Sequence, residues 1–165
     1  SGVAMGLDII PGVLVICTLV MLLTFGPGTD AAGAAVYTGA AYEGVALLPK
    51  LGQLLSPITG ILFGFQDPTN IAFPITSMGA TGAAMALVPP MLKSGAAGFN
   101  EVAVFTAIGM CWSGYLSTHV SMMDALDKRV VIKAAIFSHT IGGLCAGVAA
   151  HYLYVLFSMI VNMLA

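Results

Sequence analysis

The chain has 165 residues, of which 59% are hydrophobic and only 7% charged, with a formal net charge of −2. A soluble domain carries about 25% charged residues, so this chain has too few to cover a surface that faces water. The small net charge and the lack of a basic stripe give no indication of nucleic-acid binding.

The five basic and seven acidic residues are clustered, and they leave uncharged windows over residues 9–29, 69–92, 102–123 and 134–165. Each window exceeds the roughly 20 residues that a helix needs to cross a bilayer. The first window is not preceded by the basic segment of a secretory signal peptide. The sequence therefore predicts an all-α fold, namely one polytopic transmembrane helix bundle with four or five spans and a broken or re-entrant helix.

The first predicted helix covers residues 9–25 and starts at Asp8, with Pro11 in its first turn. Gly and Pro at positions 26–28 end it. Residues 29–44 are rich in Ala and Gly. They fit a loop, an interfacial segment or a closely packed helix, and the sequence does not distinguish these three.

The next apolar segment, residues 47–65, is interrupted by Lys50, Pro57 and glycines. Its uninterrupted part, residues 58–65, is too short to span a bilayer. This segment is predicted to be a half-helix or a re-entrant hairpin.

Residues 66–70, Gln-Asp-Pro-Thr-Asn, form a turn and helix-start signal. The helix predicted after it, residues 71–92, contains Pro74 and ends at the prolines 89–90. Its middle, residues 76–82, holds two glycines and three hydroxyl side chains. These residues weaken a helix, so the sequence predicts that this one is discontinuous.

Two further spans follow, over residues 102–123 and 134–163, separated by the most charged loop of the chain. Three of the five basic residues, Lys128, Arg129 and Lys133, lie in that loop. Basic loops stay in the cytoplasm, which places the C-terminus on the outside.

Two apolar segments are interrupted by hydroxyl groups, one at Ser77 and one at Ser117 to His119. Irregular backbone at membrane depth lines a cavity or is buried in protein, and secondary transporters bind solutes at such breaks. We expect the two breaks to share one cavity, although Ser and Thr also bond to their own helix turn. The candidate substrate-binding residues are Asp67, Asn70, Thr76, Ser77, Thr81, Ser117, Thr118 and His119.

Some of these residues have simpler explanations. Asp67 stands before Pro68, where it is expected to cap a helix, with ion coordination as the alternative. His139 is expected to be hydrogen-bonded near the membrane interface, and His151 is expected to pack helices or to lie at the interface. The three histidines have no carboxylate in the same windows, so no metal site and no cofactor are predicted. The spacing of His119 and Asp124 matches that of membrane acyltransferases, but the arginine cluster that binds glycerophosphate is missing.

Four short stretches carry a family resemblance: residues 10–16, 63–65, 75–84 and 98–105. They resemble the nucleoside-recognition, or Gate, domain family, and in particular its short bacterial inner-membrane members, which occur as paired paralogues. Residues 29–50 look like an insertion relative to those members. The His119 region, with Ile141-Gly142-Gly143, is similar to ethanolamine-transporter-like proteins.

The resemblance implies a subunit of a secondary transporter in the bacterial inner membrane that moves a small polar solute. No phosphate-binding loop of the Gly-x4-Gly-Lys-Ser/Thr type occurs, so the energy would come from a coupling ion or a partner. The expected partners are lipid, the solute and either a second copy or a paralogous subunit. The alternatives are a non-transporting scaffold subunit, an ion gate and, least favoured, the acyltransferase.

Overall fold

The computed structural model describes residues 10–11, 14–15, 18–40, 42–113, 123 and 126–164. This part of the chain is mostly helical, as predicted, and contains one long apolar helix. Of the first predicted helix, residues 10–11, 14–15 and 18–24 are described, and all are helical. The chain bends at Phe25, directly before the Gly-Pro-Gly segment that was predicted to end this helix.

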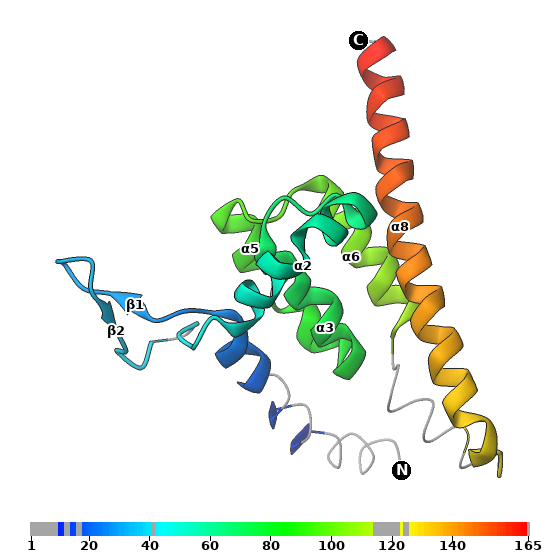
Figure 1. Ribbon diagram of the computed structural model, residues 1–165, viewed down its shortest axis with the longest axis horizontal. Helices are drawn as coiled ribbons and strands as arrows, with labels where there is room; N and C mark the ends of the chain where they lie inside the picture. Colours follow the sequence, from blue (N-terminus) through cyan, green and yellow to red (C-terminus); the bar gives the residue numbers. More distant parts are fainter. Residues whose placement is uncertain are drawn as a thin grey trace.

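The elements follow one another as β1 (Gly28–Thr29), β2 (Ala35–Val36), α2 (Leu47–Phe63), η1 (Pro68–Ile71), α3 (Ala72–Gly79), α4 (Thr81–Met85), α5 (Val88–Ser94), α6 (Phe99–Cys111), η2 (Arg129–Val131) and α8 (Ile132–Leu164). Figure 1 shows α8 running along one side of the shorter helices and continuing beyond them at its C-terminal end. The β1–β2 hairpin projects from the opposite side.

The described part of residues 29–44 is mostly turns and irregular backbone, which agrees with the loop among the three alternatives, and it also contains a short hairpin that was not predicted. β1 and β2 pair antiparallel, with Gly28 opposite Val36 and Thr29 opposite Ala35. The turn between them is held by Asp30, whose Oδ1 accepts hydrogen bonds from the N–H groups of Ala32 at 2.9 Å and Ala34 at 2.8 Å. The hydrogen bonds of the Asp30 side chain, rather than a preference of the flanking residues for strands, hold this hairpin together.

Helix α2 is longer than the short half-helix predicted over residues 58–65, since it begins at Leu47. It ends at Gly64, whose φ of 69° is a left-handed conformation that suits glycine. The residues after Gly64 return along α2 and pass close to Gly52. A Cβ atom on Gly52 would lie 2.0 Å from the carbonyl oxygen of Pro68. About 16 Å of helix is thus retraced by the few residues between Phe63 and Pro68. The half-helix or re-entrant hairpin in a membrane stays a prediction.

The predicted discontinuous helix is confirmed. Helix α3 ends at Gly79, Ala80 takes an extended conformation with φ −157° and ψ 107°, and α4 begins at Thr81. The predicted end at the prolines 89–90 is wrong, because both lie in the first turn of α5. Proline is tolerated there because the first N–H groups of a helix have no partner within the helix.

Helix α6 begins at Phe99, before the predicted start at residue 102, because the Glu101 carboxylate accepts the N–H of Gly98 at 2.9 Å. Its inner face supplies the centre of the core, with Val104, Ile108 and Trp112 at most 1% exposed. Phe105 stacks on Phe73 of α3 with ring centroids 4.3 Å apart. This packing fixes the broken helix against α6.

The segment Arg129–Leu164, formed by η2 and α8, is long and apolar enough to cross a membrane by length and composition. Within the described residues it is the one helix that meets this criterion, and α2 and α6 are shorter apolar helices. The last predicted span is therefore found as a single helix. The total of four or five spans stays a prediction.

Candidate functional site

Asp67 precedes η1 and caps it, as predicted. Its Oδ1 accepts the N–H of Thr69 at 2.8 Å and the O–H of the same residue at 2.6 Å. Both bonds satisfy groups at the start of the helix. The side chain is also at the edge of a groove of about 420 Å³, whose other polar side chains come from Thr24, Tyr42, Thr69 and Ser94.

Asn70 is completely buried, and its amide is only half satisfied. Nδ2 donates to the carbonyl oxygen of Ala96 at 2.9 Å. Oδ1 has no hydrogen-bond partner among the described residues. An unpaired buried acceptor costs about 1–3 kcal/mol, so a donor supplied here by water or by a ligand would be stabilising.

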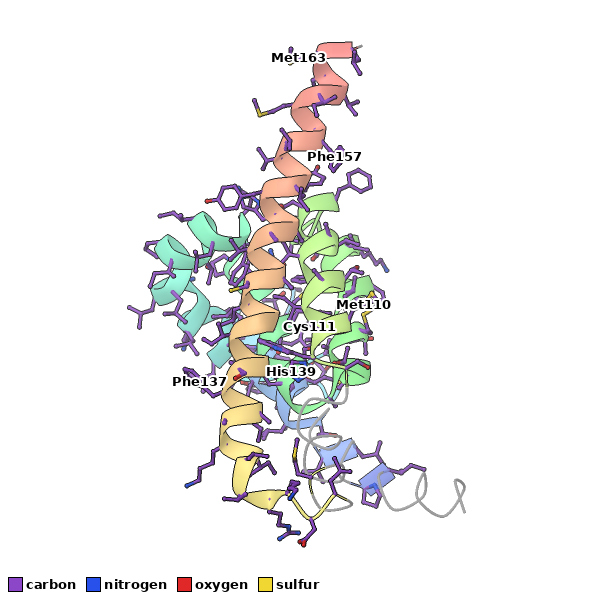
Figure 2. All side chains as sticks on the ribbon, turned by 90° about the vertical axis from the view of Figure 1, so that its right-hand side faces the viewer. Met110, Cys111, Phe137, His139, Phe157 and Met163 are labelled. Atoms are coloured by element: carbon purple, nitrogen blue, oxygen red, sulfur yellow. The ribbon has the colours of Figure 1, made fainter. Side chains whose placement is uncertain are left out.

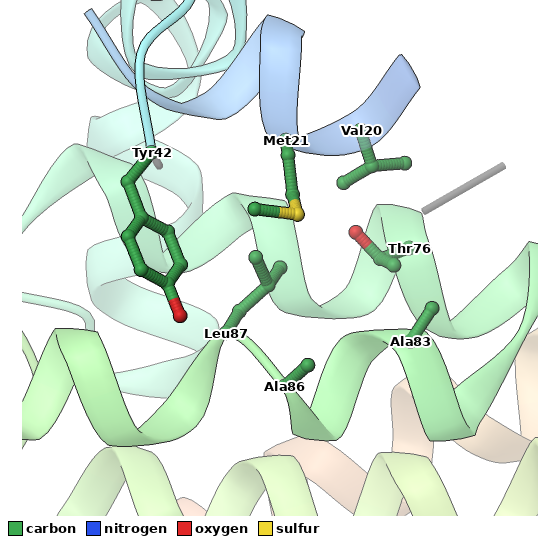
Figure 3. Close-up of a pocket in the computed structure, with 7 residues that line it drawn as sticks. All are labelled: Val20, Met21, Tyr42, Thr76, Ala83, Ala86 and Leu87. Carbon is green, nitrogen blue, oxygen red and sulfur yellow. The ribbon is translucent and has the colours of Figure 1, made fainter. Parts of the chain in front are cut away.

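Thr76 fits the simpler of the two explanations for a hydroxyl in an apolar helix. Its Oγ1 donates to the carbonyl oxygen of Ala72, one turn earlier, at 2.6 Å. The side chain borders a cavity of only about 60 Å³, which has room for water rather than a solute. In Figure 3, Thr76 and Tyr42 lie on opposite sides of this cavity, with Met21 and Leu87 between them.

Ser77 and Thr81 face each other across the break at Ala80, with their hydroxyl oxygens 3.1 Å apart. Thr81 donates to the carbonyl oxygen of Trp112, also at 3.1 Å. A threonine hydroxyl has a single proton, so the hydroxyl of Ser77 is the donor to Thr81 in this arrangement. A chain of hydrogen bonds thereby connects the broken helix to the C-terminal end of α6.

Thr81 also lines a groove of about 350 Å³ between α4 and α6. The other residues that line this groove, called here the break groove, are Met85, Phe105, Thr106, Gly109, Met110 and Ser113. Three of the lining side chains are hydroxyls, and the rest are apolar or aromatic. Ligand sites commonly combine an apolar wall with a few polar groups that fix orientation, so this groove has the composition of a solute site.

The structure does not bring all the predicted residues into one cavity. Within the described residues, Asp67, Thr76 and Thr81 border three separate spaces. Helix α3 turns its hydroxyls to different sides, because successive helical positions differ by about 100°. Ser117, Thr118 and His119 lie outside the described residues. The structure joins the first break to Trp112 at the end of α6, and the shared cavity with the second break stays a prediction.

The sequence did not indicate a second polar cluster, which is formed by Asn100 and His151. Nδ1 of His151 lies 2.7 Å from Oδ1 of Asn100, and Nδ2 of Asn100 donates to the carbonyl oxygens of Phe63 at 2.9 Å and Gly64 at 3.3 Å. One side chain of α6 therefore joins the end of α2 to the middle of α8. His151 was expected to pack helices, and it does so through a specific hydrogen bond.

His139 lies at the other end of the contact between α6 and α8, where its Nε2 bonds to the carbonyl oxygen of Cys111. Figure 2 shows His139 and Cys111 next to each other where α8 meets α6. The two histidines and two glycines, His139, Gly143, Gly147 and His151, recur every fourth residue. That spacing is the signal in the sequence that indicates one face of α8.

Within the described residues, no group of three or more His, Cys, Asp or Glu side chains is placed to hold a metal ion. Comparison with known proteins finds no matching family model, no matching curated protein and no matching solved structure. The function therefore has to be inferred from the geometry of the chain itself.

Proposed function

We propose that the chain is a subunit of a secondary membrane transporter and that a small polar solute binds in the break groove. The observation that carries this proposal is the hydrogen-bonded chain from Ser77 through Thr81 to the carbonyl oxygen of Trp112. Broken helices at membrane depth are tolerated where they line a cavity, and transporters use them to bind solutes. The break lies within residues 75–84, one of the stretches that resemble the Gate domain family.

A membrane environment explains the surface of the molecule. Only 6% of the apolar window of α8 is buried inside the protein. Phe157 and Met163, which are 61% and 84% exposed, extend from the end of α8 beyond the other helices in Figure 2. Covering such apolar surface with lipid or a partner gains about 25 cal/mol per Å² relative to water. The four or five spans and the inner-membrane location are parts of this proposal.

The chemistry of the break groove suggests which solutes would bind. Its polar side chains in the described part of the chain are the hydroxyls of Thr81, Thr106 and Ser113. Neutral donors and acceptors suit an uncharged or zwitterionic solute, with the apolar part of the solute against Phe105 and Met110. The remaining wall of this groove is proposed to come from a second copy or a paralogous subunit.

The test uses the complex purified in mild detergent and reconstituted into liposomes. Radiolabelled uridine, ethanolamine and serine serve as probes for a nucleoside, an amino alcohol and an amino acid. Thr81→Val keeps the shape of the side chain and removes its hydroxyl. The loss of a buried hydrogen bond to the solute is expected to weaken apparent affinity about 5- to 150-fold, equivalent to 1–3 kcal/mol.

Thr59→Val is the matched control, because the Thr59 hydroxyl bonds to the carbonyl oxygen of Leu55 on its own helix and lies outside the break groove. It should transport like the parent chain. Equal uptake by Thr81→Val and the parent would place the site elsewhere. If no probe is taken up, and both variants change only the thermal stability, the alternative of a scaffold subunit is correct.

A further inference from the structure

Helix α8 packs on α6 through a row of four residues spaced four apart, His139, Gly143, Gly147 and His151, called here the histidine–glycine row. The two glycines let the helices approach closely. A Cβ atom on Gly143 would lie 2.0 Å from Nε1 of Trp112, and one on Gly147 would lie 2.8 Å from Ile108. Small residues allow such contacts between apolar helices, and the histidines stand at the two ends of the row.

The His139 end of the row is closed by hydrogen bonds. Nε2 of His139 contacts the carbonyl oxygen of Cys111, and Nε1 of Trp112 donates to the carbonyl oxygen of His139 at 3.1 Å. The imidazole thus uses its outer nitrogen to hold the last turn of α6. Because a carbonyl oxygen only accepts hydrogen bonds, Nε2 of His139 carries the proton of this bond, and the basic nitrogen of its ring is Nδ1.

The His151 end has a different hydrogen-bond arrangement. The amide of Asn100 is oriented by the two carbonyl oxygens that its Nδ2 contacts, so its Oδ1 faces His151 as an acceptor. Nδ1 of His151 must then carry a proton, because a bond to an acceptor requires a donor. Nε2 is left with its lone pair, and it has no hydrogen-bond partner in the described part of the chain.

The ring is also held in place by its neighbours. A Cβ atom on Gly64 would lie 2.3 Å from Cε1 of His151, so the glycine leaves room for the imidazole. Tyr152 lies beside it with ring centroids 4.9 Å apart. The imidazole is half-buried in the one described helix long enough to cross a membrane.

One carboxylate stands near this ring. Oε1 of Glu101 lies 3.4 Å from Nδ2 of Asn100, and the Glu101 side chain is only 5% exposed. Within the described residues, the other ionisable groups around His151 are Tyr152 and Tyr154 of its own helix, and α2 contributes the carbonyl groups of Phe63 and Gly64. The carboxyl group of Glu101 thus lies on the other side of the Asn100 amide from His151.

We propose that Nε2 of His151 is a proton-binding site and that its proton is the coupling ion of the transporter. The coupling part of this inference rests on the function proposed above. The proton is taken from water on one side of the membrane and returned to water on the other, and no covalent bond of the chain changes. When Nε2 is protonated, the bond from Nδ1 to Asn100 becomes charge-assisted and stronger.

The proton site and the break groove occupy opposite ends of α6. From Asn100 to Gly109, the first groove residue of its last turn, the helix rises about 14 Å. A change in the bond at His151 is passed to the groove by α6 itself, since its N-terminal end holds Asn100 and its C-terminal end holds Trp112. The two sites can therefore be tested separately.

The first experiment reads the proton directly and needs no solute. Chains labelled with ¹⁵N-histidine are titrated between pH 5 and pH 8.5 in lipid nanodiscs and observed by NMR. One histidine is expected to keep Nδ1 protonated throughout while Nε2 gains its proton as the pH falls. This signal should be absent in His151→Asn. A His151 whose Nε2 does not titrate in this range would overturn the proposal.

The second experiment reads the coupling in liposomes, with the probe that the parent chain transports. A difference of one pH unit supports about tenfold accumulation at one proton per solute. His151→Asn keeps a donor near the position of Nδ1 and lacks Nε2, so it is expected to exchange labelled for unlabelled probe but not to accumulate it. Thr59→Val, whose parent hydroxyl bonds only within its own helix, should still accumulate the probe. If His151→Asn accumulates the probe as the parent does, the proton at His151 is not the coupling ion. If the parent chain moves no probe, the transporter proposal is refuted, and the NMR result on proton binding still stands.

Discussion

At the scale of single residues, Gly143 has no room for a side chain. A methyl group there would lie 2.0 Å from Nε1 and 2.4 Å from Cε2 of Trp112. Trp112 cannot move aside freely, because its Nε1 donates to the carbonyl oxygen of His139 and its ring is 1% exposed. Close packing at this position thus depends on glycine.

We predict that Gly143→Ala destabilises the chain by about 1–3 kcal/mol, the usual cost of overpacking a well-filled core. Gly142→Ala is the matched control, since nothing lies within 4 Å of a Cβ atom at that position. Alanine there should raise the helix stability by about 0.5–1 kcal/mol. Thermal unfolding in detergent measures both, and equal melting temperatures for the two variants would show that α8 does not pack on Trp112.

Residues whose partners are close in sequence were the easiest to predict. Asp67 caps η1 through the N–H and O–H groups of Thr69, two positions away, so the Asp-Pro-Thr sequence contains the whole interaction. Asn100 and His151 are separated by 51 positions, and only the packing of α8 on α6 brings them together. The sequence therefore indicated the capping role of Asp67 and did not indicate the polar cluster at Asn100.

At the scale of elements, the break at Ala80 and the long helix α8 were predicted from composition. Glycines and hydroxyls between residues 76 and 82 weaken the helix, and the uninterrupted apolar run after Lys133 extends it. The β1–β2 hairpin was missed, because its strands have only two residues each and its turn depends on the Asp30 carboxylate. Apolar windows also proved poor guides to helix bounds, since α6 begins at Phe99, before the window of residues 102–123, and ends at Cys111, inside it.

The loop between β2 and α2 is organised by Glu43. Its carboxylate accepts the Thr38 O–H at 2.6 Å, the Thr38 N–H at 2.9 Å and the Gly39 N–H at 2.8 Å. The hydrogen bond from the Thr38 side chain is the main reason why the pKa of Glu43 is below its ordinary value. Desolvation opposes it, and the hydrogen bonds from the backbone N–H groups lower the pKa further. The ionised form is therefore the one that holds the loop.

Because the pKa in the folded loop is lowered, this contribution is fully present above the ordinary pKa of 4.5 and is lost as the pH falls through the lowered value. We predict that the amides of Thr38 and Gly39 are protected from hydrogen exchange at pH 5–7 and lose protection below pH 4.5, after correction for intrinsic rates. Glu43→Gln should remove the protection at every pH. Protection that is independent of pH in the parent chain would show that the carboxylate does not hold this loop.

At the scale of the whole molecule, apolar side chains cover faces that no other part of the described chain contacts. On α2, five residues spaced by four and three positions are between 40% and 76% exposed: Leu47, Leu51, Leu54, Ile58 and Ile61. On α8, the apolar residues of the last three turns point in all directions. A helix that is apolar all round is typical of a membrane span or a core, so both faces are expected to meet lipid or another subunit.

The position of α8 in a membrane follows from its length and its charges. Its 33 residues extend about 50 Å at 1.5 Å per residue, whereas the hydrocarbon layer is about 30 Å thick. Lys133 and the exposed residues Lys128 and Arg129 mark its N-terminal end, and the rest of the helix has no charged residue. The basic end is thus expected at a water interface, with the surplus length taken up by tilt or by extension beyond the lipid.

We predict that a reporter inserted at residue 128 is cytoplasmic and that a reporter fused after residue 165 is external. Basic residues within a short loop are retained on the cytoplasmic side, and one crossing by α8 then places its other end outside. Paired alkaline phosphatase and green fluorescent protein fusions measure this, because the first is active only outside the cytoplasm and the second fluoresces only inside it. Lys128→Gln with Lys133→Gln should weaken the preference, whereas Lys93→Gln, far from α8 in sequence, should leave it unchanged. If both reporters are cytoplasmic, α8 does not cross the membrane. If the reporter at residue 128 is external and the one after residue 165 is cytoplasmic, the charges of this loop do not set the orientation.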